Sequence, residues 1–224
     1  MIAKFNRPDD GYDVGLWEGV AMSLAEMAGL NAASWAVETV DGRTVLLMRR
    51  FDREGEIRIP FLSAMSMLEA VDGENRSYME IADSLRMHSA STTEDLTELW
   101  RRVVFTVLIS NTDDHLRNHG FLYASSQGWR LSPAYDLNPV PTDIRPRILS
   151  TAIVEGDDQS ASMDLAFLAA DHFGIGDEQA REVAEEVAAA VAQWREVARG
   201  LGASNSDCDR MASAFEHEDL AVLT

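Results

Sequence analysis

The spacing of apolar residues over the first 52 positions predicts a small lobe that mixes strands with one helix. Residues 1–5 (MIAKF) have the composition of a short strand. In residues 14–30 the apolar side chains recur at steps of three and four, which is typical of one face of a helix. Two further apolar segments, residues 34–40 and 44–51, flank Asp41-Gly42, and this dipeptide is typical of tight β-hairpins.

After residue 52 the apolar pattern is mostly that of helices. The sequence STTE at residues 91–94 matches an N-terminal capping box, and an apolar stripe follows it from Leu96 to Leu108. A hairpin with a Ser-Ser-Gln-Gly turn is predicted for residues 120–133. Further helices are expected at residues 162–174, 177–199 and 206–220. Residues 53–76 show no clear pattern.

These elements predict a fold of the α+β class with two lobes. The first lobe, residues 1–52, is small and consists of a strand, a helix and a hairpin. The second lobe, residues 53–224, is mostly helical and contains the second hairpin. The 224 residues, of which 46% are hydrophobic, are sufficient for one large domain or two small lobes.

Charge and cysteine content narrow the class of protein. The chain has 38 acidic and 19 basic residues, a formal net charge of -19. Because binding to phosphate backbones or anionic lipids needs Lys and Arg, we expect no direct nucleic-acid partner and no membrane partner. The only cysteine, Cys208, precludes an intramolecular disulfide and fits a reducing compartment. No apolar segment resembles a signal peptide or a membrane span, so we expect a cytoplasmic location.

Candidate chemistry concentrates in the polar segment SNTDDHLRNHGF, residues 110–121, directly after an apolar helical stretch. Asp113 and Asn118 have the D-x-x-x-x-N spacing with which protein kinases place a catalytic base and a metal-binding amide. Asp136, in AYDLNP after the second hairpin, is a candidate for the second metal carboxylate, because Mg²⁺ prefers oxygen ligands. His115 is a candidate for fixing the loop through a hydrogen bond. The alternative is a loop whose Asp and Asn side chains only bond nearby backbone.

The first lobe offers a second charged pair. Lys4 lies on the opening strand and Glu18 on the first helix, an arrangement with which kinases bind the α- and β-phosphates of ATP. Taken singly, Lys4 is better explained as a surface residue of an edge strand, and Glu18 as a solvent-facing helix residue. The segment RRFDR, residues 49–53, stands where a hinge between the lobes would lie, or is a charged strand end.

In combination, these motifs resemble the HipA-like serine/threonine kinases, the toxin kinases of HipBA-type toxin–antitoxin modules. The resemblance rests on SNTDDHLRNHGFL and GWRLSPAYDLNPVP, and on IAKF, MRRFDR, FLSAMSMLEA and SYMEIADSLR in the same order. It implies a two-lobed protein-kinase-like fold that uses ATP and Mg²⁺. The implied site residues are the catalytic base Asp113, the magnesium ligands Asn118 and Asp136, the ATP-contacting residues Lys4 and Glu18, and the adenine hinge of Arg49, Arg50 and Phe51.

The resemblance also implies partners. Members of the family phosphorylate a protein, which by analogy would be an aminoacyl-tRNA synthetase, and are neutralised by a HipB-like antitoxin. They carry a further N-terminal region, with a loop over the ATP phosphates, before the strand that corresponds to residues 1–5. We therefore expect a separate chain to supply that region, or a truncated product.

Two other functions are compatible with the same residues. One is a catalytically inactive HipA-like remnant that binds nucleotide or a partner protein. The other is a metal-dependent hydrolase that uses the same carboxylates, although it would leave Lys4 and the hinge-like segment without a purpose.

Overall fold

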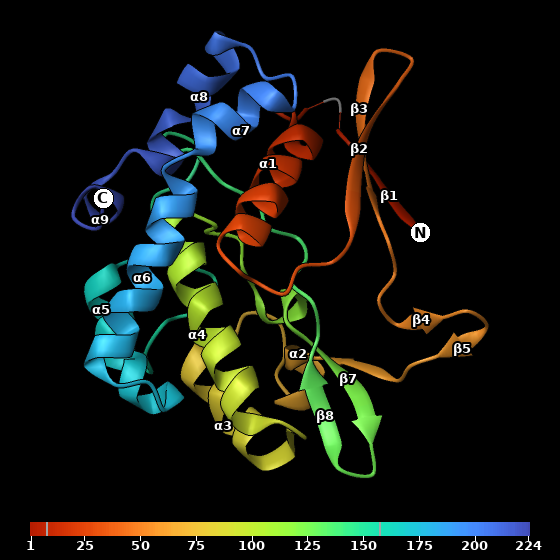
Figure 1. The fold of residues 1–224 in the computed structure, drawn as a ribbon, viewed down its shortest axis with the longest axis vertical. Coiled ribbons are helices and arrows are strands. Elements are labelled where there is room, and N and C mark those ends of the chain that lie inside the picture. The colour runs from red at the N-terminus through yellow and green to blue at the C-terminus, as the bar shows by residue number, and fades with distance from the viewer. Residues whose placement is uncertain (8, 157) are drawn as a thin grey trace.

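The computed structural model describes residues 1–7, 9–156 and 158–224, and its N-terminal part is a three-stranded antiparallel sheet with one helix (Figure 1). The sheet has the order β1-β3-β2, and Lys4 in β1 is opposite Leu46 in β3. Asp41 and Gly42 have positive φ angles of 50° and 75°, as the predicted hairpin turn requires. The elements are β1 (Ile2–Phe5), α1 (Val14–Met27), β2 (Trp35–Val40) and β3 (Arg43–Met48).

Helix α1 lies between this sheet and the helices of the second lobe (Figure 1). The Asp13 side chain caps its N-terminus by accepting a hydrogen bond from the Leu16 N–H at 3.0 Å. Its C-terminus is followed by Gly29 in the left-handed conformation. Ten of its residues are buried, and Glu18 is one of them. The expectation that Glu18 is solvent-facing when taken alone is therefore wrong.

Residues 53–76, where the sequence shows no clear pattern, form elements of two to four residues. These are β4 (Arg53–Glu54), β5 (Ile57–Arg58), β6 (Phe61–Ser63) and α2 (Ala64–Met67). Strand β6 joins the predicted hairpin, β7 (Gly120–Ser125) and β8 (Gly128–Leu131), in a three-stranded antiparallel sheet of the order β6-β7-β8. The second lobe thus contains a sheet strand that is too short to give a periodic signal.

The second lobe is built around α4, which contacts α3, α5 and α6. In addition to α2, its helices are α3 (Tyr78–His88), α4 (Thr92–Leu108), α5 (Met163–Ala169), α6 (Asp177–Val191), α7 (Trp194–Gly200), α8 (Asn205–Phe215), α9 (Glu218–Ala221) and the 3₁₀ turns η1 (Leu116–Asn118) and η2 (Ala170–Phe173). One continuous core extends from α1 through α4 to α8. Along the described part of the chain, no helix combines the length and the apolar character needed to cross a bilayer.

Three details of the helices differ from the sequence prediction. The expected single helix over residues 177–199 breaks after Val191 and resumes at Trp194, whose ring stacks on Phe215 with centroids 4.6 Å apart. The break lets Trp194 face this aromatic partner. The helix expected over residues 206–220 likewise divides into α8 and α9. Helix α4 begins where predicted, but the Ser91 side chain makes no capping hydrogen bond.

The α+β class and the kinase-like arrangement of the two lobes are confirmed by this architecture and by the structural neighbours reported below. The exact division at residue 52 stays a prediction.

Candidate active site

A cluster of three charged side chains joins the two lobes at Lys4. The Lys4 Nζ atom lies 2.6 Å from Glu18 Oε1 in α1 and 2.6 Å from Asp136 Oδ1, which follows β8. The Glu18 side chain is only 2% exposed, whereas Lys4 and Asp136 are 33% and 35% exposed. The structure therefore brings together the proposed lysine–glutamate pair and adds to it one of the two predicted magnesium ligands.

The electrostatics of this cluster keep Lys4 charged. Burial alone would lower the pKa of Lys4, but the attraction of Glu18 and Asp136 outweighs it and the pKa is raised. For Glu18, burial raises the pKa, and the neighbouring Lys4 ammonium offsets this only in part. Glu18 is thus a buried carboxylate whose ionised form depends on Lys4.

Asp136 is held in an uncommon backbone conformation, with φ at 60°. The Asn138 side-chain amide donates to both the Asp136 carbonyl and its Oδ1, each at 3.2 Å. The Asn138 N–H in turn donates to Asn111 Oδ1 at 3.3 Å. Left-handed non-glycine residues persist where the surroundings fix them. Here Asn138 links Asp136, in the segment after β8, to Asn111 in the loop after α4, and these bonds hold the Asp136 backbone in place.

The loop after α4 carries the predicted D-x-x-x-x-N motif. The Asp113 side chain is 60% exposed, and its Oδ1 accepts a hydrogen bond from Arg145 Nη1 at 2.7 Å. Asn118 is buried, and its amide donates to the Asp113 carbonyl at 3.4 Å. The two motif residues therefore share one compact loop, with the carboxylate of Asp113 open to solvent.

The adjacent Asp114 has the opposite environment. It is 3% exposed and accepts hydrogen bonds from Thr106 Oγ1 at 3.3 Å, from the Tyr78 hydroxyl and from His119 Nε2 at 3.1 Å. Burial alone would raise the pKa of Asp114, but His119 and the hydroxyl donors together lower it. Asp114 thus anchors the loop, which leaves Asp113 as the exposed carboxylate.

The expected role of His115 in fixing the loop is wrong. Its Nδ1 is buried without a hydrogen-bond partner among the described residues. His119 has the anchoring role instead, because it follows η1 and reaches Asp114 from the start of β7.

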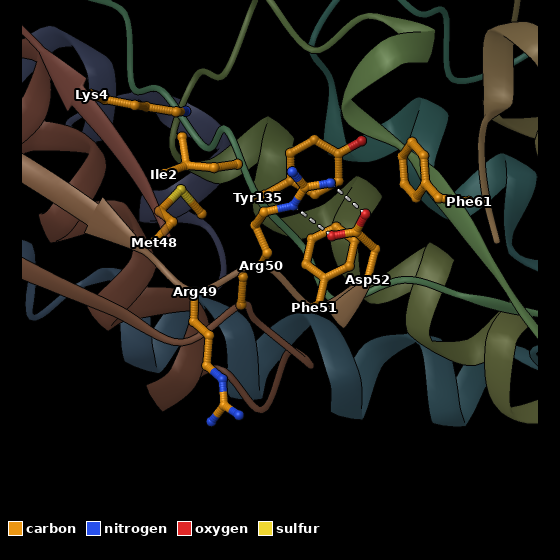
Figure 2. Close-up of a pocket in the computed structure, with 10 residues that line it drawn as sticks. Ile2, Lys4, Met48, Arg49, Arg50, Phe51, Asp52, Phe61 and Tyr135 are labelled. Carbon is orange, nitrogen blue, oxygen red and sulfur yellow. Dashed lines mark hydrogen bonds and ion pairs between the residues drawn. The ribbon is translucent and has the colours of Figure 1, made fainter. Parts of the chain in front are cut away.

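A cavity of about 400 Å³ opens beside Lys4, between the two lobes (Figure 2). Phe51 and Tyr135 pack with ring centroids 5.4 Å apart, and Phe51 and Phe61 with centroids 6.0 Å apart. Ile2 and Met48 add aliphatic surface next to the Lys4 side chain. A mostly apolar cavity with one cation at its edge suits a flat aromatic ring that carries an anionic group.

The predicted hinge, Arg49 to Phe51, lines this cavity, but its residues differ in what they offer. The Arg49 side chain points away from the cavity in Figure 2, and its N–H donates to the Ser34 carbonyl at 2.8 Å. Arg50 is paired with Asp52 through two hydrogen bonds. Within the described part of the chain, the backbone N–H groups of Arg50 and Phe51 make no hydrogen bond. The backbone at these two positions is thus available to a ligand.

The donor set fits a magnesium ion in part. Asp136 offers a carboxylate and Asn118 an amide oxygen, and Mg²⁺ sites usually combine one or two protein oxygens with phosphate and water oxygens. The Tyr135 hydroxyl donates to the Arg117 carbonyl at 2.7 Å, so the chain positions next to both ligands are tied together. Within the described residues no group of three or more His, Cys, Asp or Glu could hold a metal. A nucleotide would therefore have to contribute the remaining oxygens.

Sequence reasoning missed several residues of the site. Asn138 bonds to Asp136 and Tyr135 bonds to the Arg117 carbonyl, and their place within AYDLNP could have indicated their importance. Arg145, the partner of Asp113, lies in a segment with no recognisable pattern, 32 positions away. No signal in a single sequence would have connected them.

Two lobes with a lysine–glutamate pair, a polar loop after a central helix and an aspartate after the following hairpin define a kinase-like fold. The family comparison makes this specific. The HipA-like C-terminal domain family matches residues 1–194, so the chain belongs to this family.

Curated relatives carry kinase names. "Putative kinase Y4dM" of Sinorhizobium fredii is 31% identical over 144 residues, which are 62% of this chain and 32% of the relative. "Putative kinase" of Haemophilus influenzae is 28% identical over 94 residues, which are 41% of this chain and 27% of the relative. The matched segments thus span about a third of these relatives or less.

Solved structures share the fold. HipA of Shewanella oneidensis MR-1, in a complex with HipB and operator DNA, superposes with a TM-score of 0.76 at 18% identity, over 99% of this chain and 57% of that HipA. The Helicobacter pylori proinflammatory kinase CtkA superposes with a TM-score of 0.58 at 15% identity, over 89% of this chain and 86% of CtkA. At these identities the likeness establishes the fold alone.

Proposed function

We propose that this chain transfers the γ-phosphate of Mg-ATP to a serine or threonine hydroxyl of a protein. The observation that carries the proposal is the contact of Lys4 Nζ with both Glu18 and Asp136 at 2.6 Å. A phosphate-binding lysine must be held between the lobes and beside the metal carboxylate, because phosphoryl transfer depends on positioning and charge stabilisation.

Each residue has a role in this proposal. The adenine ring lies in the apolar cavity against Phe51, and Lys4 contacts the α- and β-phosphates. Asp136 and Asn118 would hold the magnesium ion, which would neutralise charge on the phosphate oxygens. The exposed carboxylate of Asp113 accepts the proton of the acceptor hydroxyl.

The partners follow from the family rather than from the site. The Shewanella HipA was solved with HipB and operator DNA. By that likeness we include a HipB-like antitoxin, and with it a toxin–antitoxin role, in the proposal. The protein substrate, an aminoacyl-tRNA synthetase by analogy, is a further part of it.

The test is transfer of labelled γ-phosphate from ATP by the wild type and by Asp113→Ala. Asp83→Ala is a matched control, because Asp83 is also an exposed carboxylate whose arginine partner, Arg86, lies at 2.7 Å. We expect Asp113→Ala to lower transfer by about 10²- to 10⁴-fold, the range for loss of a general base, and Asp83→Ala to leave it unchanged. Equal transfer by wild type and Asp113→Ala would contradict the assignment.

A second candidate is a member of the family that binds nucleotide without transferring phosphate. It is favoured by the ion pair of Asp113 with Arg145, which occupies one oxygen of the proposed base while the cavity beside Lys4 stays open to a nucleotide. It predicts saturable Mg-ATP binding by the wild type and by Asp113→Ala, with no transfer by either. The hydrolase alternative instead predicts phosphate release without a protein acceptor.

A further inference from the structure

The ion pair between Asp113 and Arg145 places an exposed arginine on the proposed catalytic carboxylate. Asp113 Oδ1 and Arg145 Nη1 are 2.7 Å apart, yet the side chains are 60% and 45% exposed. Exposed ion pairs generally form weakly, because two long side chains must be held in one geometry against solvent screening. A persistent contact therefore requires that the segment carrying Arg145 be held by something else.

Helix α8 holds one side of that segment, which we call the Arg145 turn (residues 141–147). The Thr142 N–H donates to Ser213 Oγ at 3.0 Å. Arg210 Nη1 donates to Asp143 Oδ1 at 2.8 Å. Both partners lie on α8, so this helix fixes the second and third residues of the turn.

Helix α9 and the end of α4 hold the other side. Arg147 Nη1 lies 2.7 Å from Asp219 Oδ2 in α9, and both side chains are less than a fifth exposed. Arg147 Nη2 also donates to the Val107 carbonyl, in the last turn of α4, at 3.0 Å. Between these two anchors the backbone closes on itself, since the N–H of Arg145 donates to the Pro141 carbonyl at 3.1 Å.

We propose that Arg145 is a positioning residue for Asp113, and that α8 and α9 act as a C-terminal brace that keeps it there. The proposal rests on the function proposed above. The guanidinium binds Oδ1 of Asp113, which leaves Oδ2 to accept the proton of the acceptor hydroxyl. Fixing the orientation of a general base in this way raises the rate of the transfer step without changing nucleotide binding.

The brace lies outside the part of the chain that matches the family. The match ends at residue 194, whereas α8 and α9 occupy Asn205–Phe215 and Glu218–Ala221. Arg145 itself lies within the matched range, but the contacts that fix its turn come from beyond it. The C-terminal helices thus support the loop that carries Asp113, and they are not among the elements that line the nucleotide cavity.

The first arm of the test measures the brace without requiring activity. Hydrogen–deuterium exchange is followed by mass spectrometry in the full chain, for the wild type, Ser213→Ala/Arg210→Ala and the control Arg86→Ala. We expect peptides that cover residues 141–147 to exchange about tenfold faster in the double variant, because two anchoring hydrogen bonds are lost. Unchanged exchange there would overturn the brace.

The second arm measures transfer from Mg-ATP to dephosphorylated casein as the acceptor probe. We expect Arg145→Ala to lower kcat by about 10²-fold, with KM for Mg-ATP within about twofold of the wild type. Arg145→Lys recovers part of kcat, because it keeps the charge but not the planar fork. Arg86→Ala, which breaks an ion pair of the same length and similar exposure, leaves both constants unchanged.

The outcomes separate the two proposals. A kcat for Arg145→Ala equal to the wild type, or raised above it, would overturn the positioning role, and a raised kcat would mark the pair as inhibitory. A loss of kcat that only follows a loss of melting temperature would reduce Arg145 to a structural residue. Transfer absent from the wild type contradicts the proposed function itself, while the exchange arm still reports on the brace.

Discussion

Replacing Lys4 with methionine should destabilise the protein through the carboxylate that it leaves behind. Methionine keeps most of the aliphatic stem of lysine, so the main loss is the ammonium. Glu18, with its side chain 2% exposed, would then be a buried charge without its partner. Breaking a buried ion pair from one side typically costs 3–5 kcal/mol. Because Lys4 and Asp136 are each about a third exposed, water reaches the site, and we expect about 2–3 kcal/mol here.

The pH dependence of this loss has a definite sign. The pKa of Glu18 in the folded protein is raised above its ordinary value of 4.5, and removal of Lys4 raises it further. A carboxyl group with a raised pKa makes the folded state relatively more stable below its unfolded pKa, and this contribution is lost as pH rises through the folded pKa. The difference in free energy of unfolding between wild type and Lys4→Met should therefore narrow as pH falls toward 4.5.

Urea unfolding at pH 7 and pH 5 measures these quantities. Lys4→Met/Glu18→Gln should be more stable than Lys4→Met alone, because the unpaired charge is gone. Arg86→Ala is the control, and its exposed i,i+3 pair should contribute only about 0.2–0.5 kcal/mol. A loss of stability below about 0.5 kcal/mol in Lys4→Met would refute this reasoning. So would a double variant whose loss of stability equals the sum of the losses in Lys4→Met and in Glu18→Gln, because Glu18 would then not depend on Lys4.

Two further predictions concern the helical lobe and the second hairpin. Burial lowers the pKa of His217 to about 4, so the folded protein resists protonation of this side chain, and its stability should fall as pH drops from 6.5 toward 4. His217→Asn should remove about 1–2 kcal/mol of this loss in acid unfolding curves. An unchanged pH profile of the variant would disprove the link. Gly128 has φ at 128°, and a Cβ at this position would collide with the His88 carbonyl oxygen. Gly128→Ala should therefore lower stability by about 2–4 kcal/mol in urea titrations while nucleotide affinity stays intact, and a fully stable variant would contradict the strained turn.

The sequence predicts the parts of the site that depend on local motifs. The spacing of Asp113 and Asn118 places them in one loop, whereas the pairing of Lys4 with Glu18 is predicted only by analogy with kinases. The contact of Lys4 with Asp136 spans 132 positions, and the sequence does not predict it, because it assigns the two residues separate roles in phosphate and metal binding. Their roles in binding and transfer stay predictions.

Other features depend on packing that a single sequence does not encode locally. No glycine or proline marks the break between α6 and α7, and Trp194, the first residue after it, stacks on Phe215. Strand β6 has three residues and is recognisable only through its pairing with β7. Likewise, the Arg145 contact exists because α8 and α9 hold a loop far from them in sequence. Long-range anchoring of this kind carries no periodic signal.

Calorimetric titration of Mg-ATP into the wild type and into Asp136→Asn tests the central claim most directly. Asparagine tolerates the left-handed backbone at this position and keeps the shape of the side chain, so only the charge changes. We predict saturable binding by the wild type that is weakened about tenfold or more in the variant, with a stability loss below about 1 kcal/mol, since the Lys4–Asp136 pair is partly exposed. Equal affinity for both proteins, or no binding by either, would contradict a nucleotide site built on Asp136 and Lys4.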